Sequence, residues 1–533
     1  MNVIFMRHGE AVDNVQEILS NKETQCSILT EKGNQQVKKT ASTIDFNIDK
    51  IYSSPLIRTL QTSRIISSDT IPIIIDDRIR EIDWGEYSGK KNNKQLDDIR
   101  RRQTSGDFFV RFGQYGENKY DIELRLLEFL EEIYDTNFKN NTIMIVTHGT
   151  IISFMKRILN LKPSHAKKGS FEQFNNIDFS PLSIYRKKLK QARDNEVGKR
   201  IDLVNTLSSS VSLKTKSAYR KIAKDEFNNI ELDFKTLNLL VQGLNDDLNK
   251  SFELSYVRAN ENPVLICLFK DFENFIDRWM AHYISAGAKN FVFINNGSTD
   301  NSLERIESHI NKDISIDIWD VNIAYDCFRS CGWKQQLLEY YGTNRWYLVV
   351  DSDELFTIGK TFIIDEYINA LESEQQTASK SLMLDVYSKK SLFSTGDEDF
   401  HLVDSYGYKK EFGKCYGYRV YGGPRQRLFG TRSSLQKISL FKYSGDEIMI
   451  NDHFMYPWSV NKASMSSVLL HYKFISGDIT KYNSFIKSGV HWNNSSEYKR
   501  YMDVYNNDEN ITFYNPQISI NISDIKLSIL FDN

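Results

Sequence analysis

This chain of 533 residues has few cysteines, no excess of charge of one sign and no long apolar run. Its five cysteines are too few and too scattered for a disulfide framework, which favours a reducing cytoplasm. Lys and Arg number 68 and Asp and Glu 70, a balance that argues against a general nucleic-acid binder, because such proteins carry a basic excess. Neither a signal peptide nor a membrane span is visible. We therefore expect a soluble cytoplasmic protein whose contact with a membrane is limited to peripheral association at its inner face.

Two of the cysteines, Cys327 and Cys331, are separated by three residues and could form half of a metal site. No second pair of Cys or His at zinc-like spacing accompanies them in the sequence. We prefer the interpretation that they are two small thiols in the core or near a site.

The chain is longer than one hydrophobic core usually fills, so we expect at least two domains. From residue 1 to about 188, short apolar segments alternate with amphipathic helical patterns, which indicates a layered α/β domain. The predicted strands are 3–6, 50–53, 142–147 and 182–186, and the predicted helices are 31–42, 56–67, 121–134 and 151–159.

Residues 189–255 are rich in Lys and Arg, and we interpret them as a helical linker or a bridging helical layer. This segment could touch a membrane surface or an acidic glycan, but a solvated helix face is the preferred interpretation. A second α/β pattern occupies 256–533. Its predicted strands are 264–269, 290–295, 315–320 and 346–350, and its predicted helices are 274–286, 301–311 and 332–341.

Two predicted strands of the first domain end in a histidine. The first strand runs into Arg7 and His8, a later one runs into His148, and Arg58 stands at the start of a helix between them. Strands of an α/β domain end in a common crevice, so these four side chains can converge there.

Such a set suits a phosphoryl group. Guanidinium groups pair bidentately with phosphate oxygens, and a neutral imidazole can attack phosphorus and hold the phosphoryl group as phosphohistidine. A proton donor is also needed for the leaving alkoxide. Glu81, in an apolar-flanked segment, is our candidate for this general acid and for the later activation of water.

In this order the motifs resemble the histidine phosphatase superfamily with its phosphoglycerate mutase branch. The resemblance spans about 1–188 and implies a phosphoglycerate mutase-like three-layer α/β fold that uses no cofactor. The matching residues are Arg7, His8, Gly9, Glu10 and Asn14; Leu29, Thr30, Gly33 and Gln36; Ser54, Pro55, Arg58, Gln61 and Thr62; Glu81, Gly85 and Gly89; Gly116, Glu117 and Arg125; and His148 and Gly149.

The resemblance also implies roles for individual residues: His8 is the nucleophile, Glu81 is the acid, and the phosphoryl group is held by Arg7, Asn14, Arg58 and His148. Some members of the superfamily are mutases, which return the phosphoryl group to another hydroxyl. Asn118 stands where many members have Ser, so the substrate cannot be carried over. We prefer net hydrolysis, because fusion to a second enzyme suggests a trimming step.

In the second domain, a predicted strand runs directly into Asp351 and Asp353. Alternate carboxylates on one side of an extended segment suit a hard divalent cation, Mn²⁺ or Mg²⁺, which would bridge a diphosphate. With the preceding strand, helix and Asn295 to Asp300 turn, this region resembles the GT-A fold glycosyltransferases, within them the family-two-like group. The resemblance implies a Rossmann-like GT-A domain with a nucleotide sugar as donor.

By that resemblance the sugar nucleotide lies near Asn295, Asn296, Asp300 and Asp351, and the metal is held by Asp351 and Asp353. His471 follows an apolar strand and is either a third metal ligand or a packed core histidine.

Two other sets of residues in this domain are weaker candidates. Arg425 and Arg427 either meet a diphosphate or acidic acceptor or carry ordinary surface charges. By position alone, Asp452 or His453 is a candidate for the catalytic base of an inverting transfer.

The sequence thus favours a bifunctional α/β enzyme of surface polysaccharide synthesis (capsule or lipopolysaccharide), a metal-dependent glycosyltransferase fused to a histidine phosphatase. The expected partners are a nucleotide sugar and a phosphorylated small-molecule or glycan acceptor. Two alternatives stay open. The phosphatase could act on a separate sugar phosphate or as a mutase, or one domain could be a module that only binds phosphate. The sugar, the order of the two reactions and the oligomeric state cannot be read from the sequence.

Overall fold

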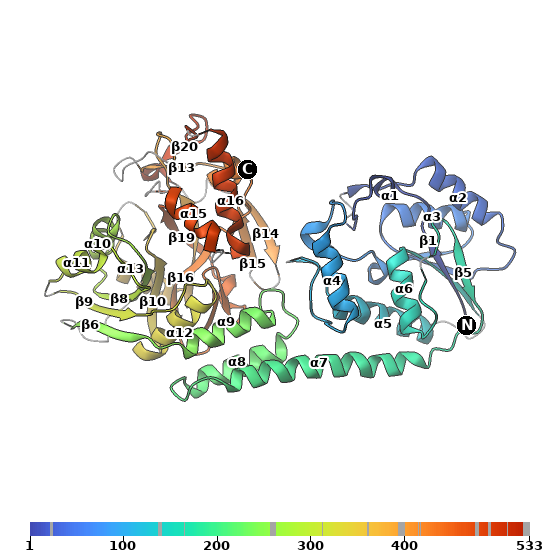
Figure 1. Cartoon of the computed structure of the whole chain (residues 1–533), viewed down its shortest axis with the longest axis horizontal. Coiled ribbons are helices and arrows are strands. Elements are labelled where there is room, and N and C mark those ends of the chain that lie inside the picture. Colours follow the sequence, from blue (N-terminus) through green and yellow to red (C-terminus); the bar gives the residue numbers. More distant parts are fainter. Residues whose placement is uncertain are drawn as a thin grey trace. The chain divides into compact units, whose positions relative to one another are not determined.

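The computed structural model divides the chain into two compact units, Met1–Gly198 and Lys199–Asn533. Both units are α/β (Figure 1). The structure describes residues 1–21, 25–113, 115–136, 141–164, 166–255, 263–311, 313–359, 362–392, 400–413, 415, 417–474, 479–488, 492–508 and 510–525.

The first unit contains a five-stranded sheet with the order β3-β2-β4-β1-β5. The first four strands in that order are parallel, and β5 is antiparallel to β1. The strands are β1 (Asn2–Arg7), β2 (Lys50–Ser53), β3 (Ile73–Ile75), β4 (Thr142–Thr147) and β5 (Phe171–Phe174).

Helices cover both faces of this sheet (Figure 1). On one face, Ile4 and Met6 of β1 form a core cluster with Val37 of α2 and Ile66 of α3. On the other face, Tyr52 packs edge-on against Phe129 of α5. The helices are α1 (Val12–Gln16), α2 (Glu31–Ala41), α3 (Ile57–Ser67), α4 (Lys94–Thr104), α5 (Lys119–Thr136) and α6 (Gly149–Ile158).

The strand predicted at 182–186 is wrong, because these residues belong to helix α7 (Pro181–Asn205). Proline is tolerated at the first position of a helix, and Leu182, Tyr185 and Leu189 are buried at helical spacing. The last strand of the unit is instead β5, which pairs with β1 along Val3 to Met6.

The second unit contains a nine-stranded sheet with the order β11-β19-β12-β16-β10-β7-β8-β9-β6. Its centre, β10-β7-β8-β9, is parallel. The strands are β6 (Asn249–Ser255), β7 (Val264–Phe269), β8 (Asn290–Asn295), β9 (Ser315–Asp320), β10 (Arg345–Asp351), β11 (Glu354–Thr357), β12 (Ala378–Asp385), β16 (Gln436–Tyr443) and β19 (Met465–His471).

Two-stranded pairs and helices surround this sheet. The pairs are β13 (Leu402–Asp404) with β20 (Ser519–Asn521), β14 (Lys409–Gly413) with β15 (Gly417–Tyr421), and β17 (Ile448–Asn451) with β18 (Phe454–Tyr456). The helices are α8 (Leu213–Asp225), α9 (Phe234–Asn245), α10 (Ile276–Ser285), α11 (Ser302–Ser308), α12 (Arg329–Tyr341), α13 (Ile364–Ser373), α14 (Gly423–Phe429), α15 (Ile479–Ser488) and α16 (Trp492–Asn507).

Alternate residues of β7 point to two separate core clusters. Leu265 and Cys267 join the cluster under α10, α11 and α13, whereas Val264 and Ile266 join the cluster under α8, α9 and α12. Figure 1 shows α10 and α11 on one side of the strands and α9 and α12 on the other. A central strand buried on both faces is typical of a doubly covered parallel sheet.

The segment that we interpreted as a linker, 189–255, contributes α8 and α9 to the second unit. Tyr219, Leu240 and Leu244 are buried in the same cluster as residues of β7, β8 and β10, because the apolar faces of both helices cover this sheet. The boundary that we expected at residue 188 lies within α7.

Helices α9 and α12 approach each other at two glycines, Gly243 and Gly332. A Cβ atom added to Gly332 would lie 2.6 Å from the carbonyl carbon and 2.7 Å from the Cα of Gly243. Only glycine permits this approach without a shift of the backbone.

Candidate active site

The two histidines of the first unit lie at neighbouring strand ends. β1 and β4 are parallel and in register from Asn2 with Thr142 to Arg7 with Thr147, so His8 and His148 leave the same edge of the sheet. Their ring centroids are 5.1 Å apart, and both side chains are buried.

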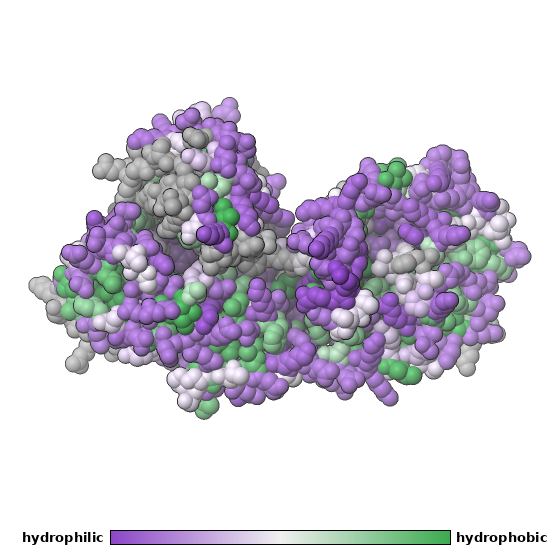
Figure 2. Space-filling model, in the orientation of Figure 1, coloured by the Kyte–Doolittle hydropathy of each residue, from purple (hydrophilic) through white to green (hydrophobic). Residues whose placement is uncertain are grey.

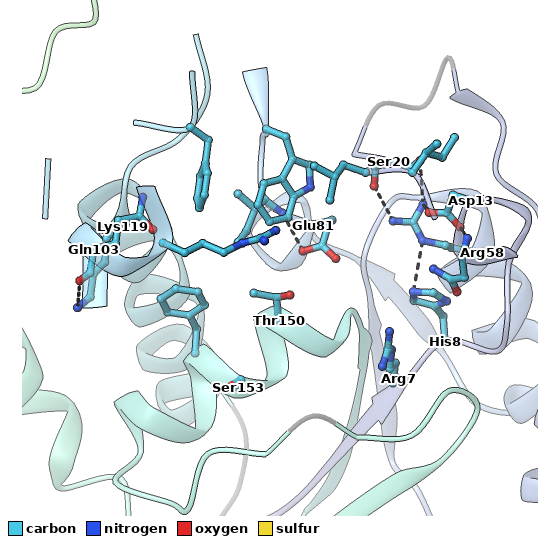
Figure 3. A pocket seen from close by; sticks show the side chains of 18 of the residues that line it. Arg7, His8, Asp13, Ser20, Arg58, Glu81, Gln103, Lys119, Thr150 and Ser153 are labelled. Carbon is cyan, nitrogen blue, oxygen red and sulfur yellow. Dashed lines mark hydrogen bonds and ion pairs between the residues drawn. The ribbon is translucent and has the colours of Figure 1, made fainter. Parts of the chain in front are cut away.

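Arg58 joins the two rings. Its Nε lies 3.4 Å from Nε2 of His8 and its Nη2 lies 3.3 Å from Nδ1 of His148. The same guanidinium donates to the carbonyl of Ser20 at 2.8 Å and lies 3.6 Å from Asp13. Figure 3 shows Arg58 directly beside His8 in the wall of a pocket. A buried guanidinium held this firmly is a preformed site for phosphate oxygens.

The ring of His8 is held in one tautomer. Its Nδ1 lies 2.7 Å from the carbonyl of Gly9, which can only accept, so Nδ1 carries the proton and Nε2 keeps its lone pair. Burial and the charges of Arg58 and Arg7 lower the pKa of His8 well below its ordinary value. The imidazole is therefore neutral and can act as a nucleophile through Nε2.

His148 is fixed by two contacts of its own. Its Nε2 lies 2.9 Å from the hydroxyl of Ser54, and its Nδ1 faces Arg58. Burial, followed by the charge of Arg58, lowers the pKa of His148 well below its ordinary value. A neutral His148 can form hydrogen bonds without adding charge to the site.

Glu81 also lies at this pocket, with its Oε2 4.0 Å from Nδ1 of His148. Burial raises the pKa of Glu81, which favours the protonated acid. Figure 3 shows its carboxyl group facing the space beside Thr150. A protonated carboxyl in this position can supply a proton to a leaving group.

The loop that carries Glu81 is held by a half-buried ion pair between Arg125 and Glu117. Arg125 Nε and Nη2 donate to the two Glu117 oxygens at 2.7 and 3.0 Å. Arg125 Nη1 also donates to the carbonyl of Arg80 at 3.1 Å, and Glu117 accepts from the amide of Asp83 at 2.9 Å. The loop is thereby fixed on both sides of Glu81, at Arg80 and at Asp83.

Arg7 and Asn14 line the same pocket. Arg7 donates through Nη1 to the carbonyl of Ala166 at 3.2 Å, whereas its buried Nε has no hydrogen-bond acceptor among the described residues. Asn14 uses its side-chain oxygen to cap the first turn of α1, by accepting from the amide of Ala11 at 3.2 Å. The unmatched donor of Arg7 favours an anionic ligand.

The structure thus brings together all six residues predicted for the phosphoryl site: Arg7, His8, Asn14, Arg58, Glu81 and His148. The sequence analysis missed Asp13 and Ser20, which anchor Arg58 from the segment that follows β1. Asp13 comes five residues after the nucleophile candidate, and no motif in the sequence marks it as the partner of Arg58. The pocket has a volume of about 560 Å³.

In the second unit, Asp351 at the end of β10 is bound by two buried lysines. Lys334 lies 3.3 Å from one carboxylate oxygen and Lys437 lies 2.9 Å from the other. Burial disfavours the charge of Asp351, but these two ammonium groups hold its pKa far below the usual range. Lys437 also binds Glu354 at 2.7 Å, and Lys334 binds Asp452 at 2.6 Å.

His471 lies between two carboxylates, with Nδ1 2.7 Å from Asp385 and Nε2 3.4 Å from Asp353. Burial alone would lower its pKa, but Asp353 and Asp385 raise the pKa of His471 to about 9. An imidazolium has no lone pair for a metal.

This arrangement does not fit the predicted metal site of Asp351, Asp353 and His471. Lysines take both oxygens of Asp351, and carboxylates take both nitrogens of His471. Within the described ranges, no three His, Cys, Asp or Glu side chains are grouped so that they could hold a metal ion.

The predicted nucleotide-binding residues form the turn after β8. Asn295 donates to Asp320 at 2.8 Å, Asn296 donates to the carbonyls of Val321 and Ile323, and Asp300 accepts from the amide of Glu273 at 2.9 Å. β10 and β8 flank β7, so this turn and Asp351 share the carboxyl edge of the parallel strands.

Arg425 and Arg427 lie on α14 and are both ion-paired. Arg425 is buried between Asp385 and Glu497, each at 2.8 Å, so the interpretation of Arg425 as an ordinary surface charge is wrong. Arg427 is partly exposed and donates to Asp404 at 2.9 Å. Contact of these arginines with a diphosphate or an acidic acceptor stays a prediction.

Cys327 and Cys331 are free thiols in the structure, and Cys331 is buried. Asp452 is ion-paired with Lys334, which also binds Asp351. Nδ1 of His453 lies 2.9 Å from the carbonyl oxygen of Gln436.

No helix in the described part of the chain is long and apolar enough to span a membrane. In Figure 2 the face in view is dominated by hydrophilic residues.

Comparison with known proteins places the similarity in the first unit. Residues 3–196 match the family model described as histidine phosphatase superfamily (branch 1). Phosphoserine phosphatase 1 of Hydrogenobacter thermophilus is 33% identical over 158 residues, which cover 28% of this chain and 71% of the relative. The 2,3-bisphosphoglycerate-dependent phosphoglycerate mutase of Thermoplasma acidophilum is 38% identical over 93 residues, or 17% of this chain and 46% of the mutase.

Among solved structures, the mycobacterial glucosyl-3-phosphoglycerate phosphatase is 20% identical, with a TM-score of 0.29. The match covers 32% of this chain and 91% of that protein.

Proposed function

The chain belongs, through residues 3–196, to the histidine phosphatase superfamily (branch 1), and we propose that its first unit hydrolyses phosphomonoesters through a phosphohistidine on His8. The geometry of His8 carries this proposal. Its Nδ1 proton is engaged by Gly9, and its unprotonated Nε2 lies beside Arg58.

In the first step, the lone pair on Nε2 of His8 attacks phosphorus, and the bond from phosphorus to the leaving oxygen breaks. Glu81 gives its proton to that oxygen, so the alcohol leaves neutral. Arg7 and Arg58 bind the phosphoryl oxygens and stabilise the charge that they gain in the transition state. Asn14 orients the same oxygens, and His148, whose nitrogens face Ser54 and Arg58, keeps the Arg58 guanidinium in place beside them.

In the second step, water attacks the phosphohistidine while the Glu81 carboxylate takes a proton from it. The phosphorus–nitrogen bond breaks, inorganic phosphate leaves, and His8 is neutral again. A mutase would instead pass the phosphoryl group to a second hydroxyl. One relative is named a phosphatase and another a mutase, so the two outcomes need an experiment.

The direct test is to follow inorganic phosphate and phosphorylated protein with p-nitrophenyl phosphate as substrate. Wild type should release phosphate, and acid quenching should destroy a labelled phosphoprotein that base quenching preserves, as expected for phosphohistidine. His8→Ala should abolish both signals while keeping the fold. A mutase is detected with a substrate that has a second hydroxyl, such as 3-phosphoglycerate: an isomerised phosphate ester without released phosphate would overturn net hydrolysis.

For the second unit we propose glycosyl transfer from a nucleotide sugar to a phosphorylated acceptor, which the first unit then dephosphorylates. The parallel order β10-β7-β8-β9, with Asp351 and the Asn295 to Asp300 turn at one carboxyl edge, supports this proposal, because open α/β sheets bind ligands at that edge. Capsule or lipopolysaccharide synthesis is the pathway that we favour. A requirement for Mn²⁺ or Mg²⁺ stays a prediction.

This second proposal is tested by incubating the protein with a panel of nucleotide sugars and phosphorylated three-carbon acceptors, with and without Mn²⁺. Mass spectrometry of the His8→Ala reaction should show a phosphorylated glycoside that wild type converts to the dephosphorylated form, and Asp353→Ala should form neither. If His8→Ala leaves the glycoside unchanged but no longer hydrolyses an unrelated sugar phosphate, the units act on separate substrates. Absence of any glycoside would leave the second unit as a binding module.

A further inference from the structure

A cavity of about 410 Å³ lies in the second unit, away from Asp351. Its lining comes from the start of α8 and the ends of α9, α12 and β16, and these three helices lie on one side of the sheet (Figure 1). Tyr443 of the lining pairs with Arg345 at the start of β10, whereas Asp351 ends β10. The cavity is therefore at the opposite edge of the sheet from Asp351, and neither of the proposed reactions uses it.

Helix α12 contributes one face to this cavity. Gln336, Glu339 and Tyr340 are three and four residues apart, so they are neighbours on the helix surface. Thr343 follows just after the helix ends and also lines the cavity. The end of α12 thus presents an amide, a carboxylate and an aromatic ring to the same space.

Glu339 has no cationic partner in the described part of the chain. Its Oε2 accepts a hydrogen bond from the amide of Ser212 at 2.9 Å, and its Oε1 is buried without a hydrogen-bond partner among the described residues. A half-buried carboxylate that no cation neutralises favours a positively charged ligand.

The position of Glu339 in α12 strengthens this preference. It lies in the last turn of the helix, where the carbonyl ends of the peptide dipoles add negative potential. Lysine and arginine are the side chains that stabilise such an end, and the last turn of α12 has neither. A cation bound beside Glu339 would therefore interact with both the carboxylate and the helix end.

Gln336 presents an acceptor as well. Its Nε2 donates to the carbonyl of Gly243 at 2.7 Å and to the carbonyl of Asp246 at 2.9 Å. Carbonyl oxygens only accept, so these two contacts fix the orientation of the amide. The group that Gln336 offers to a ligand is therefore its Oε1.

Lys214 is the one cation among the described lining residues, and its charge is already matched. Its Nζ donates to the carbonyl of Ser444 at 2.5 Å and lies 3.5 Å from the carboxylate of Asp446. Glu339 is thus the charged group of the lining that is left without an opposite charge.

The rest of the cavity suits a small molecule that carries hydroxyl groups. Val211 and Leu244 are buried and apolar, whereas Ser210 and Thr343 are exposed and carry hydroxyls. The side chain of Tyr340 is 59% exposed and adds an aromatic surface. Small-molecule sites combine apolar walls with a few placed polar groups, and 410 Å³ lies within their range of about 300 to 1,000 Å³.

We propose that this cavity binds a small hydroxylated amine, with its ammonium group paired with Glu339 and hydrogen-bonded to Oε1 of Gln336. An ammonium group supplies both the missing positive charge and three N–H donors for a lining that offers acceptors. The carbon skeleton of the ligand lies against Tyr340 and the apolar wall. Because binding is measured without catalysis, the outcome does not depend on the proposed hydrolysis or on the proposed glycosyl transfer.

The test compares compounds that differ only in the charged group, D-glucosamine with D-glucose and ethanolamine with ethylene glycol. Calorimetric titration of the full chain gives the dissociation constants, at low ionic strength and at a pH at which the amines are protonated. In at least one pair the amine should bind roughly 10- to 100-fold more tightly, the worth of a hydrogen bond to a charged group. Equal binding within both pairs would overturn the proposal.

Two variants of Glu339 locate the binding. Glu339→Gln keeps an oxygen for the amide of Ser212 but removes the charge, so the preference for the amine should fall to less than about threefold. Glu339→Asp keeps the charge and should keep part of the preference. A preference that Glu339→Gln leaves intact would exclude this cavity as the site.

Glu304→Gln is the matched control, because Glu304 is an exposed glutamate on α11 that does not line the cavity. It should bind all four compounds as wild type does. Chemical unfolding shows whether Glu339→Gln keeps the fold. If it does not, Thr343→Arg is used instead, because it places a guanidinium at an exposed position of the lining that competes with the ligand for Glu339. This variant should lose the preference, and an unchanged preference would contradict the proposal.

Discussion

Nε of Arg58 lies 3.4 Å from Nε2 of His8, so a permanent cation adjoins the ring nitrogen that has to stay unprotonated. The contact serves both states of the reaction. In the free enzyme it disfavours imidazolium, and with substrate it places the guanidinium beside the phosphoryl group that His8 accepts.

Replacing Arg58 by lysine should lower kcat/KM roughly 100-fold. Lysine keeps a charge that Asp13 can pair with, but a single ammonium cannot reach both histidines and the carbonyl of Ser20 at once. Steady-state kinetics with p-nitrophenyl phosphate measure the effect. Arg64→Lys, an exposed position on the same helix, is the control and should have no effect; a wild-type value for Arg58→Lys would exclude the proposed clamp.

Glu81→Gln should slow alkyl phosphates far more than p-nitrophenyl phosphate. Glutamine cannot give a proton to an alkoxide, so we expect the rate on alkyl phosphates to fall about 100- to 10,000-fold. Nitrophenolate leaves without a proton, so the rate on p-nitrophenyl phosphate should fall less than about tenfold. Single-turnover rates on the two substrates give the comparison. Equal losses would mean that Glu81 only shapes the pocket.

The same residue should set an alkaline limit to activity. Glu81 works as an acid in its protonated form, and burial raises its pKa, so activity is present below that raised pKa and falls as the pH increases through it. The kcat/KM profile for an alkyl phosphate should therefore have an alkaline limb above pH 4.5, the ordinary value for a glutamate. Glu81→Gln should flatten it. The titration of the substrate phosphate is common to both enzymes, so an unchanged limb in the variant would assign it to the substrate.

Gly332→Ala should destabilise the second unit by about 1 to 3 kcal/mol, because the added methyl group meets the backbone of Gly243 on α9. Gly198→Ala is a matched control, since it is also a glycine in a helix and its Cβ meets nothing within 4 Å. Alanine there should raise stability by about 0.5 to 1 kcal/mol through helix propensity. Chemical unfolding of both variants measures the changes in the free energy of unfolding. An unchanged free energy for Gly332→Ala would show that the two helices can move apart without loss of stability.

The phosphoryl site could be predicted because its side chains sit next to strand and helix ends that short motifs identify. Arg7 and His8 follow one strand, His148 follows its parallel neighbour, and the alternating pattern places both at one edge. By contrast, Asp13 anchors Arg58 through a contact that no motif records.

The surroundings of Asp351 could not be predicted, because they come from distant parts of the chain. Lys334 lies on α12 and Lys437 on β16, and only the order β16-β10-β7 of the sheet brings Lys437 beside Asp351. The prediction of a strand at 182–186 is wrong for a local reason. The apolar residues of this segment are equally compatible with a strand and with one face of a helix, and the proline that begins α7 is the signal that favours the helix.

The helices α8 and α9 precede every strand that they cover, which has a consequence for synthesis on the ribosome. The apolar face of α9 shares its core cluster with Phe441 of β16. About 190 residues separate the end of α9 from the start of β16, which a ribosome needs roughly 10 to 40 s to translate. The sheet of the first unit is complete at Phe174, so the phosphatase can fold and bind substrate while the chain that carries the second unit is still being made.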